Sequence, residues 1–214
     1  MRRSRRGSKK SRFTIGWLLA AAVIAVAALG AYLYSFNFNP TAAGFPFPCG
    51  GEKTTMHVHP LLKITIDGQG VAVPAGIGII SGGTCFEPMH THDALGIVHL
   101  EAPDTNTQYT LGQFFQIWSA TYHTVTINGV SQPIVFNSTD ILGFKADATH
   151  AVTLLVDGKP SSEYGSLVLN TLDYCPVIAA NSPCGQGFGE PYYGGQPYTY
   201  GDGHTVVIEY TKSG

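Results

Sequence analysis

Three two-residue turn signals, each with glycine in second place, constrain the fold of this chain most strongly. Asp67-Gly68, Asn128-Gly129 and Asp157-Gly158 each separate two short segments rich in apolar and β-branched residues. Asp-Gly and Asn-Gly favour the type I′ turn of a β-hairpin, because both central residues of that turn need a positive φ. The sequence therefore predicts three antiparallel hairpins, over residues 59–74, 123–136 and 150–160.

One segment has the periodicity of a soluble helix. From Thr110 the chain reads TLGQFFQIWSA, in which the threonine can cap the first turn and the apolar residues recur at helical spacing. The last apolar segment, 204–210, predicts a closing strand. About 160 residues are enough for one sizeable core. The predicted fold is therefore a single domain of α+β class, with mostly antiparallel β-hairpins and one soluble helix.

The N-terminal region predicts a membrane anchor. Residues 1–13 hold seven basic residues and no acidic one, and residues 15–36 carry no charge. About 20 apolar residues span the hydrocarbon core as a helix, and the positive-inside rule keeps a basic tail cytoplasmic. A cleaved signal peptide is the alternative. The length of the run and the lack of a clear A-x-A cleavage site favour an uncleaved anchor.

The expected organisation of the chain follows from this anchor. Residues 1–13 are expected to form a cytoplasmic tail and residues 14–36 a transmembrane anchor. Residues 37–55 are expected to form a Pro- and Gly-rich linker, and residues 56–214 an extracytoplasmic β-rich domain. The protein is thus expected to cross the cell membrane once, with its N-terminus in the cytoplasm and its C-terminal domain outside.

The charge outside the tail limits the possible partners. Without the seven basic residues of the tail, five basic residues stand against fourteen acidic ones, a net charge of −9. An acidic domain does not suit nucleic acid, and it concentrates cations. Acidity also maintains solubility, and this explanation needs no ligand.

Histidines gather between residues 57 and 101. Two H-x-H pairs, in MHVHP and PMHTHD, and a further histidine in IVHLE hold five of the eight histidines. Side chains at i and i+2 of a strand share a face, so each pair can point two imidazoles the same way. The candidate metal ligands are His57, His59, His90, His92 and His99, with Asp93 and Glu101 as nearby carboxylates that could ligate or could orient an imidazole.

The residues around the pairs favour copper, with zinc as the alternative. Imidazole suits zinc, copper, iron and nickel, and Met56 and Met89 stand next to the two pairs. The competing interpretation is that the histidines hydrogen-bond to the backbone and pack as polar core residues. His123, His150 and His204 begin predicted strands singly and are interpreted as structural.

The four cysteines lie on the predicted external side, where disulfides persist. Cys175 and Cys184 flank a short loop and form an easy local pair, which leaves Cys49 with Cys85. Thiolates also bind copper and zinc, and Cys85 is five residues before His90. The residues alone therefore leave open whether Cys85 is a disulfide partner or a metal ligand.

A long segment, roughly 173–203, is rich in Gly, Pro and Tyr. A loop of this length in a compact domain is usually functional, disordered or stapled. Its aromatic part, 186–203, is a candidate surface for a protein partner, and a mobile exposed loop is the alternative.

The motifs of the chain resemble those of a family of exported or membrane-anchored prokaryotic proteins. The resemblance rests on HVHPLLKITIDGQGVAVPAGIGI, on C..PMHTHDALGIVHLEAP and on YTLGQFF.IWS, so it is strong over 57–118 and weaker over 150–210. It implies an extracytoplasmic domain with site-like histidines and no established activity. Members of this family also look to carry a cysteine upstream of the first H-x-H, which favours a Cys49–Cys85 disulfide over Cys85 as a ligand.

The sequence favours binding over catalysis. It has no G-x-S-x-G, P-loop or GxGxxG motif and no evident Ser-His-Asp order. The predicted function is that of a membrane-anchored extracytoplasmic protein with a histidine-rich transition-metal site. One alternative is a non-catalytic surface or assembly module with structural histidines. The other is a metal-dependent oxidoreductase or hydrolase.

Overall fold

The computed structural model describes residues 23–27, 44–53, 55–80, 82–174 and 204–213. The chain forms two compact units, Met1–Pro40 and Thr41–Gly214. In the first unit, residues 23–27 are helical. Within the described ranges, no helix combines the length and the apolar character needed to cross a membrane. The predicted anchor lies largely outside those ranges and stays a prediction.

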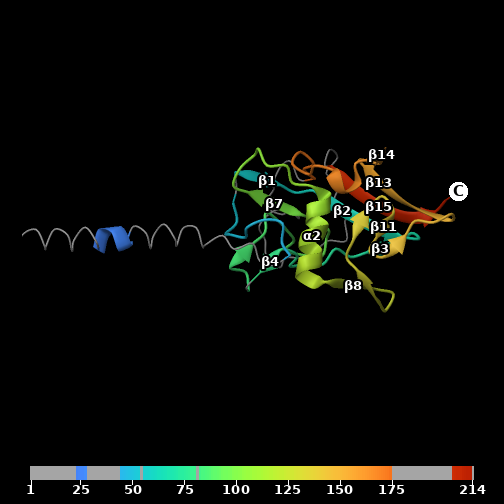
Figure 1. Cartoon of the computed structure of the whole chain (residues 1–214). Helices are drawn as coiled ribbons and strands as arrows, with labels where there is room; N and C mark the ends of the chain where they lie inside the picture. Colours follow the sequence, from blue (N-terminus) through green and yellow to red (C-terminus); the bar gives the residue numbers. More distant parts are fainter. Residues whose placement is uncertain (1–22, 28–43, 54, 81, 175–203, 214) are drawn as a thin grey trace, which may run out of the picture. The chain divides into compact units, whose positions relative to one another are not determined.

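A five-stranded sheet forms one half of the second unit (Figure 1). Its order is β14-β13-β15-β2-β3. The strands are β2 (Leu61–Ile66), β3 (Gln69–Val71), β13 (His150–Val156), β14 (Lys159–Ser161) and β15 (Thr205–Lys212). Burial alternates along β15, as expected of a strand with one face on the core. The closing strand was predicted, but its place between β13 and β2 was not.

The three predicted hairpins are confirmed. Strands β2 and β3, strands β13 and β14, and strands β8 (Thr124–Ile127) and β9 (Val130–Pro133) pair antiparallel around the expected turns. Both turn residues have positive φ in each case, for example 49° at Asp67 and 79° at Gly68. Pairing is antiparallel throughout the named strands except between β15 and β2, which run parallel.

The helix predicted from Thr110 is α2 (Leu111–Tyr122), and it runs across the middle of the domain in Figure 1. Thr110 and Gln113 form a reciprocal capping box, in which Gln113 Oε1 accepts a hydrogen bond from the Thr110 backbone N–H at 2.8 Å. The face with Phe114, Ile117 and Trp118 is fully buried. The helix is thus anchored at its start and along one side.

Shorter elements complete the domain. They are β1 (Met56–Val58), β4 (Ile79–Ile80), β5 (Cys85–Phe86), β6 (Met89–His90), β7 (His99–Ala102), β10 (Phe136–Asn137), β11 (Asp140–Ile141), β12 (Phe144–Lys145) and the 3₁₀ turn η1 (Tyr164–Ser166). Of these, β1, β7 and β6 form a three-stranded antiparallel sheet in that order. This small sheet carries the candidate site.

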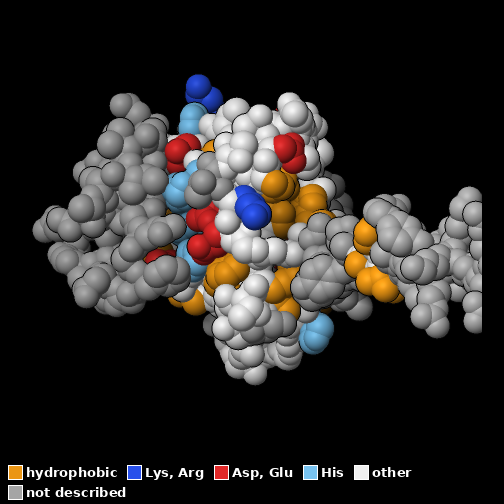
Figure 2. Space-filling model, turned by 90° about the vertical axis from the view of Figure 1, so that its left-hand side faces the viewer, with side chains coloured by type: hydrophobic (Ala, Val, Ile, Leu, Met, Phe, Trp, Pro, Cys, Tyr) orange, Lys and Arg blue, Asp and Glu red, His pale blue; other side chains and the backbone are white. Residues whose placement is uncertain are grey.

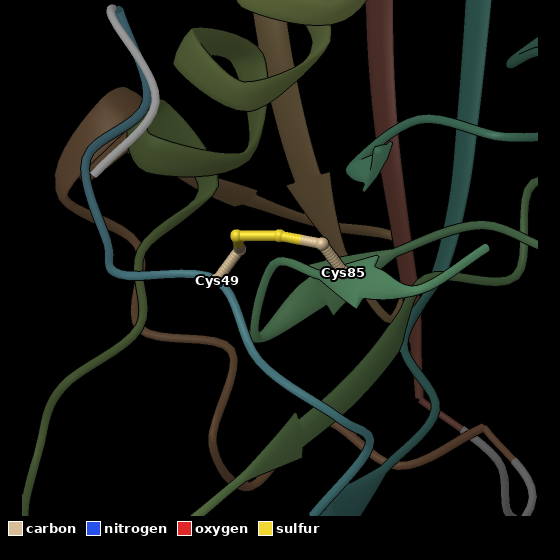
Figure 3. Close-up of a disulfide and its surroundings, with 2 residues drawn as sticks. All are labelled: Cys49 and Cys85. Atoms are coloured by element: carbon tan, nitrogen blue, oxygen red, sulfur yellow. A yellow bond between two sulfur atoms is a disulfide. The ribbon is translucent and has the colours of Figure 1, made fainter. Parts of the chain in front are cut away.

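Part of the segment expected as a linker packs on the domain. A disulfide joins Cys49 to Cys85 of β5 (Figure 3), and the neighbouring Gly50 exchanges backbone hydrogen bonds with Phe86 at 3.0 and 2.7 Å. Phe47 packs against the ring of Tyr109. The pairing favoured by the family resemblance is therefore confirmed, and Cys85 is not a free thiolate. The second predicted disulfide, Cys175–Cys184, and the aromatic segment 186–203 lie outside the described residues.

Candidate metal centre

The register of the small sheet places the site residues opposite one another. In β7, His99 and Glu101 are two residues apart and share a face. Glu101 pairs with His57 of β1, and His99 pairs with His90 of β6. The alternate residues, among them Leu100, belong to the hydrophobic core. One face of the sheet therefore builds the core, and the other face collects imidazoles around a carboxylate.

The second histidine of each H-x-H pair, His59 or His92, also lies next to His99. The ring of His99 lies between them, with centroid distances of 4.8 Å to His59 and 4.5 Å to His92. The Nε2 atoms of His90 and His92 are 3.2 Å apart. All five histidines singled out in the sequence thus converge, although β7 separates the two strands that carry the pairs. Figure 2 shows histidine and acidic side chains side by side on one face of the molecule.

The donor atoms fall into two overlapping groups. One consists of His57, His59, His99 and Glu101, and the other of His90, His92, His99 and Glu101. Within each group, all the donor atoms lie within 4.8 Å of one another. Bonds from zinc to imidazole nitrogen measure about 2.0–2.1 Å, so two nitrogens on one ion are at most about 4.2 Å apart. Each group needs only a small contraction to bind an ion.

Two carboxylates contact the imidazoles. Glu101 is buried, and its Oε1 lies 3.2 Å from His57 Nε2 and 3.3 Å from His99 Nδ1. Glu52 Oε1 lies 3.4 Å from His92 Nε2 and 3.8 Å from His90 Nε2. Glu52 was not among the predicted site residues, because it lies in the segment expected as a linker. Its position three residues after a cysteine of the disulfide is the signal that could have found it.

Two aspartates near the site accept hydrogen bonds from the backbone around it. Asp93 accepts a hydrogen bond from the backbone N–H of Leu95 at 2.9 Å and belongs to neither donor group. Asp173, which the sequence analysis did not consider, accepts one from the backbone N–H of His59 at 3.1 Å. Its Oδ1 also lies 3.7 Å from His59 Nδ1. Asp173 therefore holds His59 in place from outside the group, the role that Asp93 was expected to take for its neighbours.

Burial keeps three of the imidazoles neutral. It lowers the pKa of His90 to about 3, with a further contribution from His92, and it lowers the pKa of His92 and of His99. For Glu101 burial acts upward, but the hydrogen bond with His99 and the neighbouring imidazoles outweigh it and lower the pKa. Near neutral pH these three imidazoles are therefore neutral beside an ionised carboxylate, which is the protonation state that metal ligands need.

The backbone orients His90. Its Nδ1 donates a hydrogen bond to the carbonyl oxygen of Glu87 at 3.0 Å, and this leaves the Nε2 lone pair facing His92. Metal-bound histidines in proteins are oriented in the same way by a partner of the second ring nitrogen. The side chain of Glu87 belongs to neither donor group; it is fully buried, and burial raises its pKa to about 7 despite the backbone N–H of Phe47.

Several buried polar atoms of the site have no hydrogen-bond partner in the part of the chain that the structure describes. They are Glu52 Oε1, His57 Nε2, His59 Nδ1, His59 Nε2 and Glu101 Oε2. Buried donors and acceptors are nearly always paired, because an unpaired one costs about 1–3 kcal/mol. A bound cation would supply a partner for the lone pairs that converge here.

The two methionines beside the H-x-H pairs and the three histidines interpreted as structural lie outside the donor groups. Met56 and Met89 belong to the hydrophobic core, so neither supports copper as a ligand. His123 ends α2, and the Nδ1 of His204 is 2.7 Å from an oxygen of Asp157. His150 stacks on Tyr210. None of these three histidines belongs to a donor group found among the described residues.

The family resemblance stays a prediction from the motifs. Comparison with protein-family models, with curated proteins and with solved structures gave no match to the chain.

Proposed function

We propose that this protein is a membrane-anchored extracytoplasmic protein that binds a transition-metal ion through the histidines around β7. The observation that carries the proposal is the convergence of five imidazoles and Glu101, with donor atoms within 4.8 Å in each group. The neutral imidazole of His90 supports it, as do the buried ring nitrogens of His57 and His59 that have no hydrogen-bond partner in the described part of the chain. Ordinary core histidines would have found backbone partners for these atoms.

Copper(II) is the ion that we propose first, and zinc is the alternative. The donor set is imidazole and carboxylate, since Cys85 is in a disulfide and the methionines lie in the core. For such nitrogen-rich sites, affinity among divalent ions is highest for Cu²⁺. The argument for copper now rests on the imidazoles and no longer on neighbouring sulfur.

The external location is part of the same proposal. The basic N-terminal tail and the charge-free segment after it support a single-pass topology with the domain outside. The Cys49–Cys85 disulfide supports an oxidising compartment, where such bonds persist. Copper in an oxidising compartment is present as Cu²⁺, and nitrogen and oxygen donors bind this ion well.

The exposure of the site favours exchange of the ion. The side chains of His57 and His92 are 22% and 15% exposed, while those of His59, His90 and His99 are almost completely buried. An ion held between them would be reached from one side, as storage or delivery of metal requires. The same opening favours a second candidate, a metal-dependent oxidoreductase or hydrolase, in which water or substrate occupies a coordination position.

Metal analysis of the full-length protein tests the proposal. The purified chain, stripped with chelator, is loaded with Cu²⁺ or Zn²⁺ and freed of excess metal. We expect stoichiometric copper in the wild type and a large loss in the variant with His90→Ala and His92→Ala. The matched control, with His123→Ala and His204→Ala, should retain the wild-type amount. A wild type that retains neither metal, with unfolding insensitive to chelator, would show that the histidines are structural.

A further inference from the structure

We infer that the site holds two metal ions, bridged by the carboxylate of Glu101. This inference rests on the proposed function and goes beyond it in the number of ions and in the role of one residue. Its basis is that the donors form two groups, each with its own H-x-H pair. The two pairs do not fall within one such group among the described residues.

One ion cannot use all the donors. A single ion binds imidazole nitrogens at about 2.0–2.1 Å and takes four of them in a tetrahedral site. Five imidazoles and two carboxylates converge here, which is more donors than one tetrahedral ion takes. The two H-x-H pairs also stand in separate groups, and the 4.8 Å limit on donor–donor distances holds only within each group. Two ions about 3.5–4 Å apart, as in known two-metal sites, would use both pairs.

Glu101 is placed to bridge the two ions. It is a member of both groups, and it lies at the centre of the sheet between the strands that carry the two pairs. Its Oε1 faces His57 and His99, while its Oε2 is buried without a hydrogen-bond partner in the described part of the chain. A carboxylate has two oxygens and can bind one ion with each. A second ion bound to Oε2 would supply the partner that this buried oxygen lacks among the described residues.

The remaining donors divide evenly. Glu52 contacts only the second pair, so the second ion would be held by His90, His92, Glu52 and Glu101. His99 belongs to both donor groups and its ring contacts both His59 and His92, so it is free to complete the first ion's set with His57, His59 and Glu101 once Glu52 supplies the fourth donor of the second. Each ion has four protein donors in this division, and the two carboxylates offset part of the charge.

Copper titration of the full-length protein, followed by electron paramagnetic resonance, tests this inference. We expect two copper ions per chain and a signal weaker than that of two isolated Cu²⁺ ions, because a bridge couples their spins. The pair of substitutions His57→Ala and His59→Ala, and separately the pair His90→Ala and His92→Ala, should each leave one ion per chain with a full, uncoupled signal. The control with His123→Ala and His204→Ala should bind two coupled ions.

The possible failures are distinguishable. One ion per wild-type chain, lost in both double variants, would overturn the two-ion inference and leave the proposed function in place. Two uncoupled ions would overturn the bridge by Glu101. No stoichiometric copper or zinc would overturn the proposed function itself. The wild-type stoichiometry and spin coupling decide the matter even where a double variant does not fold.

Discussion

His57 and Glu101 face each other directly across β1 and β7, and the Nε2 of the imidazole lies 3.2 Å from the carboxylate Oε1. The pair joins the first H-x-H motif to the strand at the centre of the small sheet. Because side chains alternate between the faces of a strand, this one register fixes which residues line the site and which build the core.

Replacing Glu101 by glutamine should weaken metal binding. The substitution keeps the size of the side chain and removes the negative charge that two donor groups share. We expect copper affinity to fall by at least roughly 10–100-fold, which is the cost of altering even a residue that only orients a metal ligand. Competition with a chelator of known affinity measures the loss. The exposed Glu163, replaced by glutamine, is the matched control, and equal affinities of the two variants would exclude Glu101 as a ligand.

The disulfide should stabilise both the domain and the site. Cys49 and Cys85 are separated by 36 residues, and closing a loop of that length restricts the unfolded chain by about 4 kcal/mol. The variant with Cys49→Ser and Cys85→Ser should lose stability of that order in urea unfolding. It should also lose metal affinity, because Glu52 then leaves its place beside His92.

A second variant separates these two effects. Glu52→Gln keeps the disulfide and the size of a side chain that is 29% exposed. It should lower copper affinity while changing the unfolding free energy by less than about 1 kcal/mol. If the double serine variant loses copper affinity and Glu52→Gln loses none, the disulfide supports metal binding only by stabilising the fold and not by positioning Glu52.

Local signals in the sequence were sufficient for the elements and for the donors, but not for their arrangement. The Asp-Gly and Asn-Gly turns and the Thr110 cap act within a few residues, so they were legible in the sequence. The parallel pairing of β15 with β2 joins segments about 140 residues apart and leaves no local pattern. For the same reason the position of β7 between the H-x-H strands, and with it the central role of Glu101, emerged only from the structure.

Gly96 should be essential for bringing the two H-x-H pairs together. Its φ is +85°, and an added Cβ would meet the backbone carbonyl oxygen of Leu62. Its own carbonyl accepts a hydrogen bond from the Leu62 N–H at 2.8 Å, which docks the turn before His99 on the start of β2. We expect Gly96→Ala to cost about 2–4 kcal/mol of stability, from strain and collision together, and to lower metal affinity.

Gly129 provides the control for that substitution. It has a similar φ of +78°, but an added Cβ would meet no atom within 4 Å. Gly129→Ala should therefore cost only about 1 kcal/mol, from the backbone conformation alone, and should bind copper normally. Equal losses in the two variants, measured by urea unfolding, would show that contact with Leu62 does not matter.

The buried Glu87 should make the stability of the metal-free protein depend on pH. Burial raises its folded-state pKa from 4.5 to about 7, so the stabilising state is the protonated one. This contribution is fully present below pH 4.5 and is lost as the pH rises through 7, where folding must bury the charge or bind a proton. A shift of this size corresponds to about 3 kcal/mol.

Glu87→Gln, which stays neutral, should therefore be more stable than the wild type at pH 8 and nearly equal to it at pH 4. Unfolding in urea at both values measures the difference, with Glu163→Gln as the exposed control. A variant that gains nothing at pH 8 would contradict a raised pKa for Glu87.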